Sequence, residues 1–261
     1  MARQLAAAGC VAAEEEAAEL VRAASDEDDL ESMVARRSTG EPLSWITGTA
    51  AFCGLTVLVD PGVYVPRWQS ETLARRAAEL LADTGTAVDL CTGTGAVALA
   101  LAAARPGARV VATEVDPRAA ACARRNGVHV VEGHLADPLP VDLAGTVDLM
   151  TGVLPYVPTD GLHLLPRDVL AFEPHVALDG GADGLVLVTE AVAAGTRWVR
   201  PGGWLLLEVG TDQVDGVGAL FRSAGYGSVT VLDDEEGDPR AVAGQRYGGP
   251  VDPSGGQASS R

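Results

Sequence analysis

The residues best placed to do chemistry lie in a glycine-rich turn between two apolar stretches. An apolar segment containing Asp89 leads into Gly93 and Gly95, a run of small residues typical of a helix follows, and Glu114 ends the next apolar segment. Glycine lacks a Cβ, so the backbone of such a turn can adopt positive φ angles and approach a ligand closely. A carboxylate that ends the second strand can accept hydrogen bonds from both hydroxyls of a ribose. The pattern therefore predicts a nucleoside site on a Rossmann-type unit.

The details of this turn favour S-adenosylmethionine over a dinucleotide as the ligand. Dinucleotide sites typically have a third glycine three residues after the second, and this chain has Ala98 there. Asp89, inside the strand before the turn, suits a ligand that carries an ammonium group. We therefore predict S-adenosylmethionine as the cofactor and S-adenosylhomocysteine as the product.

The composition excludes several classes of partner. The chain has 36 acidic and 19 basic residues and a formal net charge of -17, which repels a phosphate backbone, so we expect no nucleic acid partner. No segment approaches the roughly 18 consecutive apolar residues of a membrane span. The four cysteines lack the spacing of metal ligands. We predict a cytoplasmic protein with reduced thiols, no bound metal and no membrane segment.

The periodicity of the chain predicts the elements that position the turn. Residues 10–24 have apolar positions at helical spacing, and Ser25 to Asp28 resemble a capping box that begins a second helix ending near Gly40. Residues 51–60 are β-like, a turn is expected at 201–203, and the remaining helices are predicted over 70–82, 95–105, 117–125, 184–199 and 212–223.

Strands alternate with these helices. We expect strands over 86–91, 109–115, 128–132, 146–151 and 204–209. Strands separated by helices predict a parallel sheet with right-handed crossovers. Two final strands, near 226–233 and 240–247, are joined by an acidic turn and predict an antiparallel hairpin at the sheet edge.

An ordered set of short motifs runs along the chain. The motifs are Glu41 to Gly48, Phe52 to Leu55, Pro61 to Glu71, the glycine turn, Pro155-Tyr156, Phe172 to Pro174, Leu178 to Leu185, Pro201 to Gly203 and Leu207 to Gly210. This set resembles the bacterial protein glutamine-N5 methyltransferases that modify peptide-chain release factors. The resemblance implies an α/β fold of the class I S-adenosylmethionine-dependent methyltransferases, with a Rossmann-like seven-stranded sheet, its last strand antiparallel, and a small N-terminal helical domain. It also implies direct methyl transfer to a glutamine side chain of a release-factor-like protein.

The resemblance also divides the chain. We predict a helical substrate-recognition head over 1–50, a β-hairpin and linker helix over 51–83, the methyltransferase domain over 84–247 and a disordered tail over 248–261.

Site residues are carried over from the family by position. For the cofactor, the resemblance implies that the turn lies under the methionine part, that Glu114 binds the ribose and that His134 and Leu135 contact the adenine, where the family usually has an aspartate in place of His134. The turn residues are Cys91, Thr92, Gly93, Thr94 and Gly95. For the substrate, it implies contacts from Arg67, Trp68, Glu71 and Glu173.

The acceptor motif is the main departure from the family. Where the family has Asn-Pro-Pro-Tyr, this chain has Val153, Leu154, Pro155 and Tyr156, which we predict as the catalytic residues. An amide nitrogen is a poor nucleophile because its lone pair is delocalised into the carbonyl. In the family, the asparagine side chain and the next main-chain carbonyl accept the two amide N–H groups. Leu154 keeps its carbonyl, whereas Val153 has no side-chain acceptor.

Two alternatives follow from this departure. A small-molecule N- or O-methyltransferase needs no amide clamp, so a metabolite or natural product is the second hypothesis for the acceptor. A protein that binds the cofactor without catalysis is the third. DNA adenine methylation, which uses a related motif, is disfavoured by the net charge and by the missing acceptor.

Overall fold

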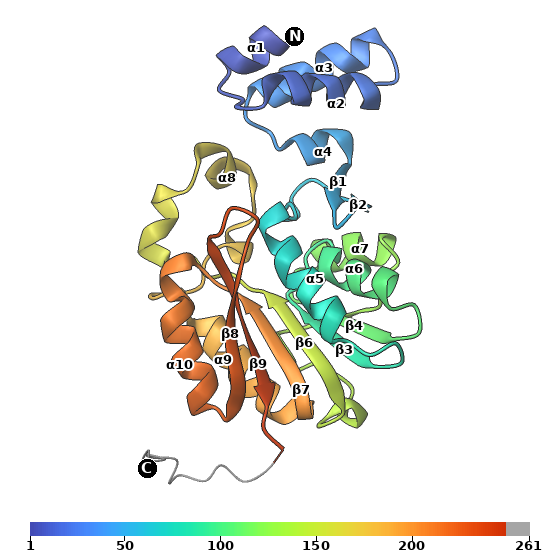
Figure 1. Cartoon of the computed structure of the whole chain (residues 1–261). Helices are drawn as coiled ribbons and strands as arrows, with labels where there is room; N and C mark the ends of the chain where they lie inside the picture. Colours follow the sequence, from blue (N-terminus) through green and yellow to red (C-terminus); the bar gives the residue numbers. More distant parts are fainter. Residues whose placement is uncertain (249–261) are drawn as a thin grey trace.

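Seven strands form the central sheet of the computed structural model, which describes residues 1–248. The spatial order is β5-β4-β3-β6-β7-β9-β8 (Figure 1). The strands are β3 (Thr86–Leu90), β4 (Arg109–Glu114), β5 (Val130–Glu132), β6 (Val147–Val153), β7 (Val199–Glu208), β8 (Tyr226–Asp233) and β9 (Pro239–Arg246). β3 to β7 are parallel, and β9 is antiparallel to both β7 and β8. The predicted fold class, including the antiparallel last strand, is confirmed.

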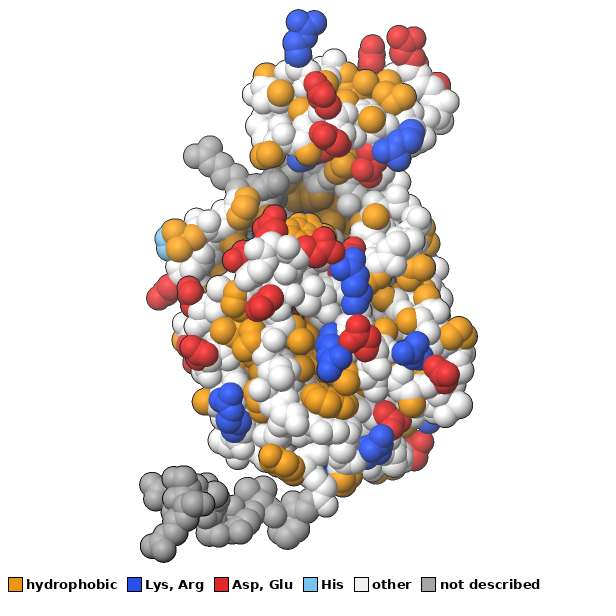
Figure 2. All heavy atoms as spheres, in the orientation of Figure 1, with side chains coloured by type: hydrophobic (Ala, Val, Ile, Leu, Met, Phe, Trp, Pro, Cys, Tyr) orange, Lys and Arg blue, Asp and Glu red, His pale blue; other side chains and the backbone are white. Residues whose placement is uncertain are grey.

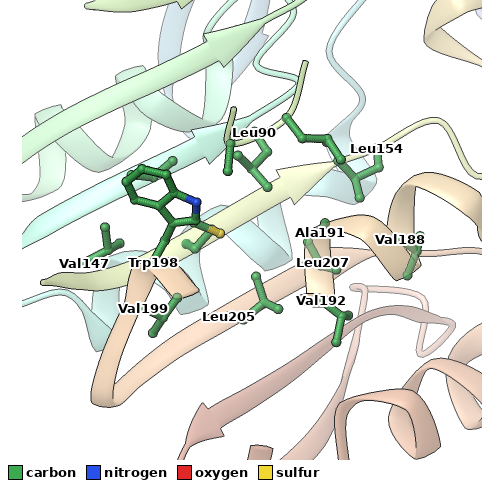
Figure 3. Packing of buried hydrophobic residues seen from close by; sticks show 14 of the residues in the cluster. Leu90, Val147, Leu154, Val188, Ala191, Val192, Trp198, Val199, Leu205 and Leu207 are labelled. Atoms are coloured by element: carbon green, nitrogen blue, oxygen red, sulfur yellow. The ribbon is translucent and has the colours of Figure 1, made fainter. Parts of the chain in front are cut away.

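Helices cover both faces of the sheet, so its inner strands are apolar on both sides. One face packs against α5 (Glu71–Leu80) and α6 (Ala96–Ala104), with α7 (Pro117–Arg125) beside α6, and the other packs against α9 (Val186–Trp198) and α10 (Val214–Ser223). Figure 3 shows the second of these cores, in which Leu205 and Leu207 lie with Ala191 and Val192. Leu206 belongs to the opposite core. Because side chains alternate along a strand, Glu208 shares the face of Leu206.

Four short helices precede the sheet and lie apart from it at the top of Figure 1. They are α1 (Ala2–Ala7), α2 (Ala13–Ala23), α3 (Glu27–Ser38) and α4 (Leu43–Thr47), around a small apolar core. The predicted capping box is wrong by one residue, because the Asp29 N–H donates to Asp26 (2.9 Å) and the Asp29 carboxylate accepts from the Ser25 N–H (2.9 Å). Asp26 is therefore the N-cap of α3.

A hairpin of β1 (Thr49–Phe52) and β2 (Leu55–Leu58) connects these helices to α5. The turn expected at 201–203 lies inside β7, in an irregularity of its pairing with β6. The long connection from β6 to α9 carries the short helices η3 (Thr159–Leu164), α8 (Arg167–Phe172) and η4 (His175–Ala177), which sequence periodicity does not predict. The tail predicted to be disordered falls, except for its first residue, outside the described residues.

Within residues 1–248, no helix combines the length and apolar character needed to cross a membrane. The same part of the chain contains no group of three or more side chains able to hold a metal ion. Its four cysteines, Cys10, Cys53, Cys91 and Cys122, form no disulfide with one another.

Candidate active site

A cavity of about 930 Å³ lies at the carboxyl ends of β3, β4, β6 and β7. Its wall includes Cys91 and Gly93 of the glycine turn together with the acceptor motif, and the connection between β6 and α9 closes one side. Figure 2 shows the surface hollowed and lined by hydrophobic side chains below the N-terminal helices. Ligands of open parallel sheets bind at this edge.

The two glycines of the turn have different roles. Both adopt left-handed φ angles, 58° for Gly93 and 83° for Gly95. A Cβ on Gly95 would lie 2.8 Å from a methyl carbon of Val128 and 3.1 Å from the Cβ of Ala123, so this glycine lets the start of α6 approach α7 and the loop that follows it. A Cβ on Gly93 would meet nothing within 4 Å, and Gly93 lines the cavity. Only Gly93 therefore leaves room for a ligand above the turn.

Glu114 is held at the cavity wall by main-chain donors. The Gly93 N–H donates to one carboxylate oxygen (2.8 Å), and the N–H groups of Val115 (2.8 Å) and Asp116 (3.0 Å) donate to the other. Burial raises the pKa of Glu114, and these three hydrogen bonds oppose that shift. The carboxylate is thus fixed in place before any ligand arrives.

Asp89 lies beneath the turn and is not part of the cavity wall. Its two oxygens accept hydrogen bonds from the hydroxyls of Thr92 (2.6 Å) and Thr151 (2.7 Å). Burial raises the pKa of Asp89 to about 6, although both hydroxyls act against the shift. Thr92 and Thr94 are also buried and off the wall, and the Thr94 carbonyl accepts from the Asn126 amide (2.9 Å). The structure gives Asp89 a supporting position instead of direct access to a ligand.

The part of the cavity that contains Gly93 and Glu114 is called the cofactor side, and its far end is formed by the loop after β5. His134 and Leu135 both line the cavity, and Leu135 is buried with a φ of 42°. His134 Nε2 lies 2.6 Å from a carboxylate oxygen of Glu190 on α9. Sequence reasoning did not identify Glu190, because its partner is 56 positions away.

The acceptor motif forms another part of the wall. Val153, Leu154, Pro155 and Tyr156 all line the cavity. The Tyr156 hydroxyl donates to Glu208 (3.3 Å), and burial raises the pKa of Tyr156.

The predicted substrate residues separate into two groups. Arg67 lines the cavity and forms an ion pair with Glu173, which is buried beside it, and its guanidinium lies over the Tyr64 ring at 5.0 Å from the centroid. Trp68 is 44% exposed, and Glu71 pairs with Arg75 (2.5 Å). Neither Trp68 nor Glu71 is among the residues that line the cavity.

Comparison with known proteins places the chain in a family. Residues 55–136 match the family model described as the methyltransferase small domain. The release factor glutamine methyltransferase of Geobacter sulfurreducens is 37% identical over 82% of this chain and 76% of its own length. The enzyme of the same name from Mycolicibacterium smegmatis is 41% identical over 83% of this chain and 79% of its own. The chain belongs to the release factor glutamine methyltransferase family.

Two further proteins are similar to this chain, one in sequence and one in fold. A Streptomyces pristinaespiralis protein named 4-amino-L-phenylalanine/4-methylamino-L-phenylalanine methyltransferase is 41% identical over 74% of this chain and 69% of its own. A methyltransferase structure from Pyrococcus furiosus shares the fold, with a TM-score of 0.56 and 20% identity over 82% of this chain and 97% of its own. The family model and the two release factor glutamine methyltransferases together show that the protein is a methyltransferase.

Other side chains of the methyltransferase site were missed by sequence reasoning. Glu208 and Arg240 line the cavity. Gln213 donates its amide N–H to the Tyr156 carbonyl (3.0 Å), and its side-chain oxygen accepts from the Gly210 N–H (2.8 Å). Glu208 had a signal in the sequence, since it is an acid at the end of an apolar strand, as Glu114 is.

Proposed function

We propose that the protein is an S-adenosylmethionine-dependent N-methyltransferase whose acceptor nitrogen is held at Val153 to Tyr156. The observation that carries this proposal is one cavity whose wall contains both Gly93 with Glu114 and the whole acceptor motif. The leading acceptor is the side-chain amide of a protein glutamine, as in the names of the relatives. We place the reaction in the cytoplasm, because cysteines that form no disulfide with one another suit a reducing compartment.

The residues of the cofactor side fit S-adenosylmethionine. A carboxylate has about four acceptor sites, and main-chain N–H groups donate three hydrogen bonds to Glu114, so it can still accept from a ribose hydroxyl. The open space above Gly93 leaves room for the methionine part. His134 and Leu135 offer an edge and an apolar surface to the adenine. When bound, the cofactor supplies an electrophilic methyl group on a sulfonium.

The chain's own residues would then orient the acceptor nitrogen. The Leu154 carbonyl can accept one N–H, and Tyr156, fixed by its bonds to Glu208 and Gln213, forms a rigid wall. Such positioning aligns the nitrogen lone pair with the methyl group, and the apolar wall excludes water.

A small-molecule amine is the second candidate acceptor. The Val153 side chain cannot accept a hydrogen bond. An amide substrate needs such a bond more than an amine does, because the lone pair of an amine is not delocalised into a carbonyl. One relative at 41% identity is named for methylating 4-amino-L-phenylalanine, in which the amino group is on an aromatic ring. Valine at position 153 and this relative both support a small-molecule amine as the second candidate.

The test combines binding with transfer. Calorimetry with S-adenosylmethionine comes first, and absence of binding would refute the proposal. Labelled-methyl transfer is then measured to a purified release factor and to 4-amino-L-phenylalanine. Label in the release factor supports the leading acceptor, and label in the amino acid supports the second. Binding without transfer to either substrate, or to components of a cell extract, would support the non-catalytic alternative.

The Val153→Asn variant tests the acceptor clamp, with Val153→Leu as a control of the same shape as asparagine but without an acceptor. An added hydrogen bond to the amide is worth about 1–2 kcal/mol, so we expect release factor methylation to rise about tenfold in the asparagine variant only. An equal response of both variants would show that volume, and not hydrogen bonding, limits the reaction.

A further inference from the structure

Glu208 is a buried carboxylate on the acceptor side of the cavity. It is 3% exposed and ends β7. One of its oxygens, Oε1, accepts the 3.3 Å hydrogen bond from the Tyr156 hydroxyl. The other, Oε2, is buried and has no hydrogen-bond partner within 3.5 Å, and the Ser70 hydroxyl lies near the carboxylate. Because leaving a buried acceptor without a hydrogen bond is unfavourable, this oxygen is suited to a donor that arrives with the substrate.

The position of Glu208 relates it to the missing asparagine. Val153 and Glu208 lie opposite each other in the register of β6 and β7. Residues in register on neighbouring strands have their side chains on the same face and about 5 Å apart. Both lie on the face of Leu206, against the core that contains α5. The Glu208 carboxylate therefore lies beside the Val153 side chain, which cannot accept a hydrogen bond.

We propose that Glu208 is a catalytic residue, whose Oε2 accepts an N–H hydrogen bond from the acceptor nitrogen and takes up its proton during methyl transfer. This inference rests on the proposed function and names the group that completes the acceptor site. The nitrogen forms a bond to the methyl carbon as the methyl–sulfur bond breaks, and the electron pair of that bond stays on sulfur. The proton leaving the nitrogen passes to Oε2 and then to solvent. The Leu154 carbonyl accepts the second N–H.

The surroundings of Glu208 suit a group that alternates between charged and neutral forms. Burial raises its pKa, and the nearby hydroxyls of Ser70 and Tyr156 and the charge of Arg240 oppose this. Arg240 is itself bonded to Asp234 (2.6 Å). Tyr64, whose own pKa is raised by burial, faces the same carboxylate. These neighbours moderate the charge of Glu208 without forming an ion pair with it among the described residues.

The experiment compares Glu208→Gln with the wild-type protein on both acceptors, a purified release factor and 4-amino-L-phenylalanine. We expect the affinity for S-adenosylmethionine, measured by calorimetry, to stay within twofold and the turnover number to fall about 30- to 100-fold. Glu235→Gln, which removes an exposed carboxylate from the turn after β8, is the charge control and should retain wild-type turnover. Glu208→Asp, which keeps a carboxylate, should retain part of the activity.

The pH profile separates proton transfer from a structural role. In the wild type, turnover should rise with pH as Glu208 loses its proton, and this acidic limb should vanish in Glu208→Gln. The Tyr156 hydroxyl lowers the pKa of Glu208. Removing it in Tyr156→Phe should raise that pKa, so the acidic limb of this variant's pH–turnover profile should move to higher pH. When all variants are measured on the same acceptor, ionisation of that acceptor affects every pH–turnover profile equally, so differences between the profiles come from the protein.

Two results would overturn the inference. Wild-type turnover in Glu208→Gln would show that Oε2 is not needed, and an acidic limb that persists in this variant would assign the proton to another group. A different result would overturn the proposed acceptors, and the inference with them. In that result, the wild type neither methylates the release factor or 4-amino-L-phenylalanine nor binds either of them in the presence of S-adenosylhomocysteine.

Discussion

The two sides of the cavity are built in different ways. On the cofactor side, Glu114 is held by three main-chain N–H groups, and the turn takes its shape from backbone angles. On the acceptor side, side chains from separate segments hold one another. Arg67 meets Glu173 across 106 positions, and Tyr156 meets Glu208 across 52.

This difference determines how freely each side can change. A main-chain site depends on local conformation, so a few spaced residues preserve it. A side-chain site can change its chemistry through single substitutions, provided that its neighbours still pack. The family resemblance of the sequence includes the glycine turn and breaks at Val153, which agrees with this contrast.

The largest effect is expected at the Arg67–Glu173 pair. Arg67→Ala removes the cation beside a carboxylate whose side chain is only 2% exposed, and breaking such a pair costs about 3 kcal/mol. Urea unfolding should show this loss of stability. The exposed pair of Arg76 and Glu79 is the matched control, and Arg76→Ala should cost less than about 0.5 kcal/mol. Equal effects of the two variants would contradict side-chain control of the acceptor side.

Glu114→Gln tests main-chain control of the cofactor side. Both carboxylate oxygens of Glu114 accept hydrogen bonds from main-chain N–H groups. In the glutamine variant, the side-chain NH2 group would replace one of these oxygens and would face a main-chain N–H donor without an acceptor between them. We expect S-adenosylmethionine to bind about 100-fold more weakly, which corresponds to about 2.7 kcal/mol. Calorimetry measures this directly, and an affinity within threefold of the wild type would contradict the assigned role.

The sequence predicts most of the sheet and the cofactor side but less of the acceptor side. Long apolar strands such as β3 and β7 are specified by their own residues, and the turn at Gly93 by local spacing. The short helix α8 has too few residues for a period to show. Gln213 and Glu190 act through side chains that reach distant segments, so only the folded chain shows that Gln213 bonds the Tyr156 carbonyl.

Asp89 supports the turn from below, and its proton links stability to pH. Its pKa is about 6 in the folded protein against an ordinary value of 3.8, so between these values the folded protein binds more protons than the unfolded chain. The free energy of unfolding therefore falls as pH rises through this window. Relative to Asp89→Asn, the wild type should lose about 2 kcal/mol between pH 4 and 7, as measured by urea unfolding. Parallel pH dependences of the two proteins would show that Asp89 does not carry the shift.

The smallest effect separates the two glycines of the turn. Gly93→Ala places a methyl group in open space at a left-handed φ, so it should cost only about 1 kcal/mol of stability while weakening S-adenosylmethionine binding by filling the ligand's room. Gly95→Ala meets Val128 and should lower stability more, with little direct effect on the affinity of the folded protein. Thermal unfolding measures the stability of both variants, and calorimetry measures their affinity for S-adenosylmethionine. If Gly95→Ala weakened binding more than Gly93→Ala, the ligand would approach the turn from the side of α7, and the two sides of the cavity would have to be assigned again.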